Sequence, residues 1–137
     1  MARQKTKAIV LDSWSVMAYF EDEPAGEKVE SVLADAHENG VPIFMTVVNA
    51  AEVWYIVARE GSPAEAEQLI AELRQLGIEF VEADWELSMA AAQFKAKCKM
   101  SLADCYAAAL AKAKKAGLVT GDKEFKQVES DVKIAWL

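Results

Sequence analysis

Four acidic side chains stand where the surrounding sequence does not favour a charge. Asp12 ends the apolar run AIVL, and Asp122 follows LVTG. Glu52 is the only charged residue in VVNAAEVWYIVA, and Asp104 is the only one in MSLADCYAAALA. If these carboxylates met, two of them about 4 Å apart would repel by roughly 4 kcal/mol at an effective dielectric of about 20. A cluster of this kind therefore needs protons or a cation.

The residue types available in the chain favour the cation. Helix N-termini expected ahead of Glu52 and Asp104 would stabilise the ionised carboxylates. Oxygen ligands suit Mg²⁺ or Mn²⁺. The chain has one histidine, His37, and its two cysteines, Cys98 and Cys105, form no CxxC pair, so zinc and copper lack their usual ligands. We therefore predict a Mg²⁺ or Mn²⁺ site, provided that the four acids converge.

Each acid also has a simpler interpretation. Asp12 and Asp122 could cap the turns that follow them. Asp104 stands three residues after Ser101, which is the spacing of a capping box. Glu52 lies in the middle of a helix that is apolar on nearly every side and should be mostly buried, so its alternative is an ion pair with a buried Lys or Arg. We favour a shared site because the simpler interpretations require four separate coincidences.

Strand and helix patterns alternate along the chain. Short apolar, β-branched runs predict strands at 7–11, 42–46, 78–81 and 118–120, with a short last strand at 133–135. Helical spacing and capping residues predict helices at 25–38, 48–60, 63–77, 84–96 and 101–116. This order predicts one α/β domain over residues 1–137, with a parallel sheet covered by helices on both faces. Asp12 and Asp122 then follow the C-terminal ends of strands, where ligands bind in such sheets.

Composition narrows the class of protein. The 137 residues are 53% hydrophobic and 27% charged, which suits one soluble globular domain. The net charge of −7 argues against sequence-independent binding of nucleic acid through a broadly positive surface. No apolar run is long enough to cross a membrane, and the start MARQKTK is not a signal peptide, so we expect a cytoplasmic protein with reduced cysteines.

The stretches that carry the four acids resemble the PIN-domain ribonucleases, and among them the VapC toxins of prokaryotic toxin–antitoxin pairs. The matching stretches are IVLDSWSVMAYFEDEP, TVVNAAEVWYIVAREG and MSLADCYAAALAKAKKAGLVTGDKEF, in the family's order. The resemblance extends from end to end of the chain. It implies a three-layer PIN-like fold with sheet order 3-2-1-4-5, a Mg²⁺- or Mn²⁺-dependent endoribonuclease, an antitoxin partner that blocks the site, and a homodimer.

The resemblance also implies roles for individual residues. The metal ligands would be Asp12, Glu52, Asp104 and Asp122, and these four would be the catalytic residues. Ser13 and Thr120 match small hydroxyl residues that support these acids from behind. Glu124 stands in GDKEF where the family often has another aspartate, so it joins the supporting residues and its direct contact with the metal stays open.

RNA that approaches an acidic pocket needs positive charge at the rim of that pocket. Lysines flank the third and fourth acids, at Lys95, Lys97, Lys99, Lys123 and Lys126. We predict RNA contacts for Lys97, Lys99 and Lys123, although a solvated helix face is the competing interpretation for any one of them. Trp14 either packs inside or stacks on a base, and Phe125 is expected in the core.

Other functions fit the sequence less well. A phosphatase of the HAD type needs a second acid two residues after the first, and that place is taken by Trp14. A receiver-like phosphoacceptor needs an Asp after a central strand, whereas PIFMT is followed by Val-Val-Asn. A catalytically inactive PIN-fold binding module is the remaining alternative, and the presence of all four acids counts against it.

Overall fold

Five short parallel strands lie at the centre of the fold, in the order β3-β2-β1-β4-β5. The computed structural model describes residues 8–21 and 24–137. The strands are β1 (Ile9–Leu11), β2 (Ile43–Thr46), β3 (Ile78–Val81), β4 (Gly117–Thr120) and β5 (Ile134–Trp136). Every residue of β1, β2 and β4 is buried, as expected for strands covered on both faces. The expected sheet order and three-layer α/β architecture are confirmed.

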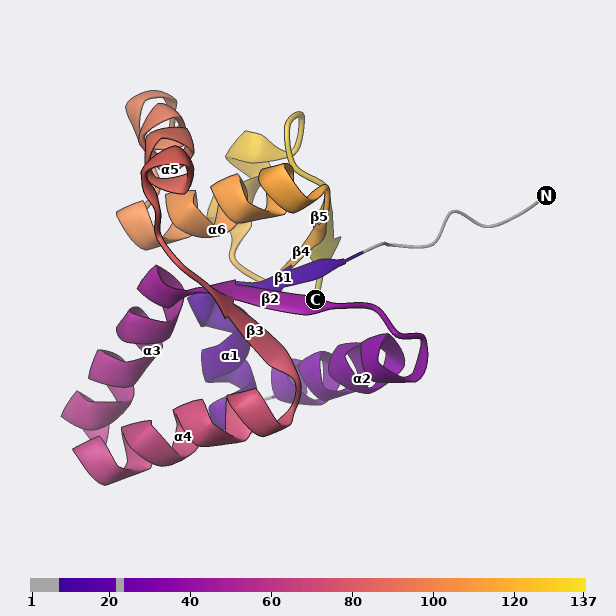
Figure 1. Ribbon diagram of the computed structural model, residues 1–137, viewed down its shortest axis with the longest axis vertical. Coiled ribbons are helices and arrows are strands. Elements are labelled where there is room, and N and C mark those ends of the chain that lie inside the picture. The colour runs from indigo at the N-terminus through magenta and orange to yellow at the C-terminus, as the bar shows by residue number, and fades with distance from the viewer. Residues whose placement is uncertain (1–7, 22–23) are drawn as a thin grey trace.

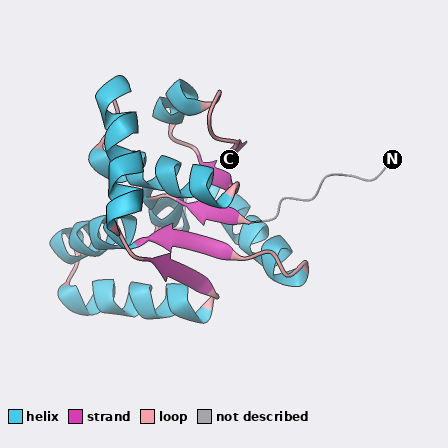
Figure 2. Cartoon of the chain, turned by 45° about the horizontal axis from the view of Figure 1, so that its top comes forward, coloured by secondary structure: helices cyan, strands magenta, loops and turns pink. Residues whose placement is uncertain are grey.

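Helices cover the two faces of the sheet (Figures 1 and 2). One layer contains α1 (Ser13–Phe20), α2 (Pro24–Glu38), α3 (Val47–Glu60) and α4 (Pro63–Gln75). The other contains α5 (Trp85–Lys97), α6 (Leu102–Lys114) and the 3₁₀ helix η1 (Lys123–Val128). Strand side chains alternate between the two cores: Val10 packs with the α5–α6 layer, whereas Ile9 and Leu11 pack with the α1–α4 layer.

Several helix starts follow directly from capping residues. The side chain of Thr46 caps α3, that of Ser62 caps α4 and that of Ser101 caps α6 by accepting a backbone N–H of the first turn. Thr46 is also the last residue of β2, so α3 begins where that strand ends. Helix α3 therefore begins at the carboxyl edge of the sheet, and α4 and α6 each begin after a short connection from the preceding helix.

The structure corrects three expectations about the helices. Helix α1 was not predicted, because it begins directly after Asp12 and its residues Trp14, Val16 and Tyr19 favour strands. Helix α6 ends at Lys114 rather than 116, since Lys115 takes a left-handed conformation with φ of 52° and Gly117 already belongs to β4. Helix α3 is not buried on all sides, because Tyr55 is 44% exposed.

The structure also bears on three other expectations, about Phe125, the cysteines and a membrane span. Phe125 is fully buried in the core, as predicted. Cys98 and Cys105 are free thiols. Within residues 8–21 and 24–137, no helix is both long and apolar enough to cross a bilayer.

Candidate metal centre

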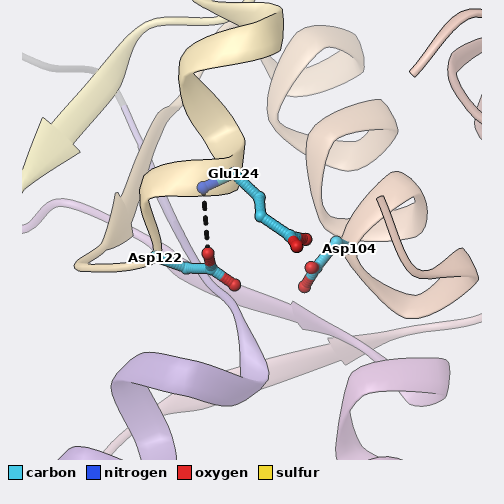
Figure 3. A group of neighbouring side chains, drawn as sticks. All are labelled: Asp104, Asp122 and Glu124. Atoms are coloured by element: carbon cyan, nitrogen blue, oxygen red, sulfur yellow. Dashed lines mark hydrogen bonds between the residues drawn. The ribbon is translucent and has the colours of Figure 1, made fainter. Parts of the chain in front are cut away.

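Three carboxylates meet beyond the ends of the sheet strands. Asp104 lies in the first turn of α6, Asp122 follows β4 and Glu124 lies in η1. One oxygen from each carboxylate lies within 4.8 Å of those of the other two. The three side chains point toward one another, Asp104 from the start of α6 and the other two from the segment that follows β4 (Figure 3). Asp104 and Asp122 are thus brought together as expected, and Glu124 joins them as a third possible ligand.

Local hydrogen bonds fix the backbone beneath these acids. The Asp104 amide donates to Ser101 Oγ at 3.1 Å, so Ser101 caps the helix and leaves the Asp104 carboxylate free to face the group. The Glu124 amide donates to Asp122 Oδ1 at 3.0 Å. The capping interpretation of Asp122 is therefore correct as far as one oxygen is concerned, and the same bond holds Glu124 beside it.

Asp12 lies behind this group and is fully buried. Its Oδ1 accepts from the Ser15 amide at 2.8 Å, which makes it the N-cap of α1. Its Oδ2 accepts from Thr120 Oγ1 at 2.5 Å, and the same hydroxyl accepts from the Asp122 amide at 3.0 Å. Thr120 therefore connects Asp12 to the Asp122 loop. Asp12 lines no part of the pocket, so the structure does not place it in the three-acid group.

Glu52 faces the same pocket from α3. It is half-buried, and none of the described Lys or Arg side chains forms an ion pair with it. A buried ion pair therefore does not explain Glu52 in the described chain. Its charge acts on Asp104, although its oxygens do not join the three-acid group.

The protonation of these acids reflects burial and mutual repulsion. Burial raises the pKa of Asp12 to about 6; the Asp122 charge adds to this, and hydrogen bonds from Thr120 and Ser15 oppose it. Burial raises the pKa of Asp104 to about 7, with further contributions from the charges of Asp12, Asp122 and Glu52. Asp104 is only 8% exposed. Near neutral pH the site is therefore short of positive charge.

The pocket itself has a volume of about 390 Å³ and two unlike sides. Glu52, Asp104 and Asp122 give it an acidic side, and Trp14, Met17 and Ile56 give it an apolar side. The Trp14 ring lies against the backbone at Gly121, because a Cβ added to Gly121 would come within 2.3 Å of that ring. Gly121 is thus the residue that lets Trp14 lie beside the acids.

Asn49 is a structural residue of the site that sequence analysis did not assign. It is fully buried, and its Oδ1 accepts from Thr46 Oγ1 at 2.5 Å. Its Nδ2 donates to Ser13 Oγ at 3.1 Å and to the carbonyl of Ala103 at 3.2 Å. Asn49 thereby joins α1, α3 and the residue before Asp104. Its position as the only other strongly polar residue in the apolar run around Glu52 was the available signal.

Of the remaining residues assigned from the sequence, Ser13 lines the pocket and the three lysines assigned to RNA do not. Ser13 hydrogen bonds with Asn49 rather than with a carboxylate. Lys97, Lys99 and Lys123 are exposed, and none of them lines the pocket. The Lys99 amide and carbonyl both bond to the Gln127 side chain, which joins the end of α5 to η1.

The ligand atoms suit a divalent cation. Asp104, Asp122 and Glu124 offer only carboxylate oxygens, which match Mg²⁺ or Mn²⁺ better than zinc or copper. Burial contributes most to the raised pKa of Asp104, and a cation would offset the carboxylate repulsion that adds to it. The carboxylate oxygens present therefore fit the Mg²⁺ or Mn²⁺ ion predicted from the sequence. Glu52 is near enough to act electrostatically on Asp104.

The fold and site define an α/β protein with a parallel sheet and an acidic pocket at its carboxyl edge. The PIN domain profile matches residues 9–130, and the chain belongs to the PIN domain family. No curated protein matches the chain.

Solved structures share the fold. A chain of VapBC2 from Rickettsia felis, bound to a promoter DNA fragment, has a TM-score of 0.75 at 16% identity, covering 95% of this chain and 98% of that one. The sarcin-ricin loop cleaving toxin VapC20 of Mycobacterium tuberculosis has a TM-score of 0.70 at 15% identity, covering 88% and 95%. FitAcB from Neisseria gonorrhoeae has a TM-score of 0.61 at 22% identity, covering 92% and 95%. At these identities the similarity establishes the fold.

Replacement of Asn49 should loosen the site by breaking its links to three elements. Asn49→Ala leaves the Ala103 carbonyl and the Thr46 hydroxyl without their partner, so we expect the free energy of unfolding to fall by about 2–3 kcal/mol. Urea denaturation measures this. The exposed Asn39→Ala is the matched control and should cost less than about 1 kcal/mol. Equal losses in the two variants would contradict the role of Asn49.

The stability of the metal-free protein should fall as pH rises. The pKa of Asp104 is raised from 3.8 to about 7, so the folded state retains a proton that the unfolded chain has lost. The resulting stability is greatest below pH 3.8 and disappears as pH rises through about 7. We expect the melting temperature to drop by roughly 5–10 °C between pH 5 and pH 8.

Asp104→Asn serves as the control for this pH effect. It removes the titrating carboxyl, so its melting temperature should depend less on pH than that of the wild type. Added Mg²⁺ or Mn²⁺ at pH 8 should stabilise the wild type more than the variant. The idea fails if scanning calorimetry gives both proteins the same pH profile.

Proposed function

We propose that this chain is a divalent-metal-dependent endoribonuclease of the VapC toxin type. The observation that carries the proposal is the convergence of Asp104, Asp122 and Glu124 beside a pocket that also contains Glu52. Membership of the PIN domain family and structural similarity to a toxin described as cleaving the sarcin-ricin loop support the same activity. The metal ligands in this proposal are Glu52, Asp104, Asp122 and Glu124, whereas Asp12, the remaining acid expected from the sequence, supports them from behind.

The roles of the side chains follow from their positions. Asp104, Asp122, Glu124 and Glu52 would hold Mg²⁺ or Mn²⁺, which supplies the Lewis acidity that polarises a phosphodiester and makes hydroxide available near neutral pH. Asp12 keeps the Asp122 loop in place through Thr120 and adds negative charge behind the site. Asn49 fixes the start of α6 through Ala103 and so orients Asp104. Histidine takes no part, since His37 is exposed on α2.

The RNA would be held by the surfaces that flank the acids. Lys99 and Lys123 are exposed near η1, and Lys97 lies at the end of α5, so these three are the proposed phosphate contacts. The apolar side of the pocket, with Trp14, would take a base unstacked from single-stranded RNA. The acidic side would then lie next to the adjoining phosphodiester.

An antitoxin and a second copy are the proposed protein partners. Several structural neighbours are VapBC complexes, including one from Salmonella typhimurium bound to DNA. By this similarity an antitoxin would cover the acidic pocket and block RNA. The second candidate function, a PIN-fold binding module without catalysis, is favoured only by the position of Asp12, which lines no part of the pocket.

The nuclease proposal is tested with purified protein, free of partner, and total RNA in Mg²⁺ or Mn²⁺. Asp104→Asn and Asp122→Asn each replace a charged carboxylate ligand with a neutral amide and should lower the cleavage rate by roughly 100-fold or more. A chelator should have the same effect on the wild type. The exposed Asp131→Asn makes the same chemical change away from the pocket and should cleave like the wild type. Equal cleavage by all four proteins would point to a contaminant and would end the assignment.

Trp14 should contribute to RNA binding rather than to the chemical step. Stacking of a base on an aromatic ring is worth about 1–3 kcal/mol, so Trp14→Ala should raise KM by about 10-fold with a smaller change in kcat. Trp14→Phe keeps a ring and should retain most of the affinity. A loss confined to kcat, or identical behaviour of the two variants, would contradict base stacking, and melting temperatures show whether either variant has lost its fold.

A further inference from the structure

The side chain of Gln127 joins the two segments from which Asp104 and Glu124 reach the site. Gln127 lies in η1, and its Oε1 accepts from the Lys99 amide at 2.8 Å. Its Nε2 donates to the Lys99 carbonyl at 3.2 Å and to the Glu124 carbonyl at 3.1 Å. One amide therefore binds the connection that leads into α6 and the backbone that carries Glu124. We call these three hydrogen bonds the Gln127 clasp.

The clasp bears on Asp104 because the chain from Lys99 to Asp104 is short and is held along its length. Met100 is only 2% exposed, and its carbonyl accepts from Lys95 Nζ at 2.6 Å. Ser101 comes next, and its Oγ caps α6 by accepting from the Asp104 amide at 3.1 Å. A displacement of Lys99 would therefore be passed on to the first turn of α6 rather than absorbed by a loose loop.

The clasp also holds the backbone of Glu124. The Glu124 amide donates to Asp122 Oδ1 at 3.0 Å, and the Glu124 carbonyl accepts from Gln127. Both backbone polar groups of Glu124 are thus bound, one by a carboxylate of the site and the other by the clasp. The Asp104 and Glu124 side chains point toward each other from α6 and η1, so contacts between these two segments set the separation of the carboxylates (Figure 3).

An amide suits this position because it carries an acceptor oxygen and two N–H donors on separate atoms. A carboxylate could still accept from the Lys99 amide, but it has no proton to offer the two carbonyl oxygens of the clasp. An apolar side chain of the same length would leave all three backbone groups to water. Residues that orient metal ligands without touching the ion typically change metal affinity by about 10- to 100-fold when they are replaced.

We propose that Gln127 is a positioning residue of the metal centre, which fixes the separation of Asp104 and Glu124 and thereby favours a small divalent cation. The inference rests on the metal site of the proposed function, and it does not depend on RNA cleavage. Mg²⁺ demands nearly ideal octahedral geometry, whereas Ca²⁺ accepts flexible coordination. Carboxylates that are held in place should therefore favour Mg²⁺ or Mn²⁺, and release of the clasp should weaken binding of these ions more than binding of Ca²⁺.

The first test titrates purified wild type and Gln127→Met with Mn²⁺, observed by electron paramagnetic resonance, with Mg²⁺ and Ca²⁺ as competitors. Methionine keeps the length of the side chain but cannot donate. Affinity for Mn²⁺ and Mg²⁺ should fall by about 10-fold or more, and affinity for Ca²⁺ by less than about 3-fold. Gln68→Met makes the same change at an exposed glutamine of α4, in the opposite layer, and should bind all three ions like the wild type.

The second test separates positioning from charge with Gln127→Glu. The added negative charge by itself would strengthen Mn²⁺ binding, whereas loss of both donated hydrogen bonds should weaken it. We expect Mn²⁺ affinity about 3- to 10-fold below that of the wild type. Because Gln127 is exposed, the melting temperatures of both Gln127 variants should stay within about 5 °C of the wild type. Unchanged or tighter Mn²⁺ binding by Gln127→Glu overturns the proposal.

The remaining outcomes distinguish the role of Gln127 from the metal site itself. Equal Mn²⁺ affinity in the wild type and Gln127→Met overturns the role of Gln127 and leaves the metal site intact. Equal losses of Mn²⁺ and Ca²⁺ affinity, together with a large drop in melting temperature, would reduce the clasp to general support of the fold and overturn the proposal as well. A wild type that binds no Mn²⁺ overturns both this proposal and the metal-dependent nuclease.

Discussion

Repulsion between carboxylates held at one edge of the sheet is the constraint on which the rest of the structure depends. Burial raises the pKa of both Asp12 and Asp104; the Asp122 charge adds to the shift of Asp12, and the charges of Asp12, Asp122 and Glu52 add to that of Asp104. Because none of the described lysines or arginines pairs with these acids, the fold must hold them against their own repulsion. It does so with hydrogen bonds from neutral groups, which keep the backbone in place without cancelling the charge that a cation needs.

Two neutral side chains are central to this support. Thr120 bonds both Asp12 and the Asp122 amide, so the ends of β1 and β4 are linked through one hydroxyl. Asn49 links α3 to α1 and to the start of α6. Every buried side-chain nitrogen or oxygen in the described chain has a partner, so the polar cluster adds no unpaired group to the core. Hydrogen bonds from neutral side chains thus surround a group of carboxylates that repel one another.

Much of this arrangement could be predicted from the sequence, because its signals are local. Apolar strand runs, capping residues and lone acids in apolar segments predict the sheet, most of the helices and the positions of Asp104 and Asp122. Helix α1 was not predicted, since Trp14 and Tyr19 favour strands, whereas in the structure Asp12 caps the helix that contains them. The bonds of Asn49 join residues 36 and 54 positions away, and no local pattern specifies them. The position of Glu124 beside Asp104 depends on the turn of η1, which the sequence did not predict.

The composition of α6 explains how Asp104 reaches the centre of the site. Ala107, Ala108 and Ala111 are almost completely buried, and α6 packs directly on β1 and β2. Small side chains there let the helix lie close to the sheet, and an aspartate reaches only a short distance from its backbone, so this closeness sets the position of its carboxylate. Helix α5 packs on the outer side of α6 and does not carry any of the acids of the site. Helix α5 therefore bears on the position of Asp104 mainly through its packing on α6.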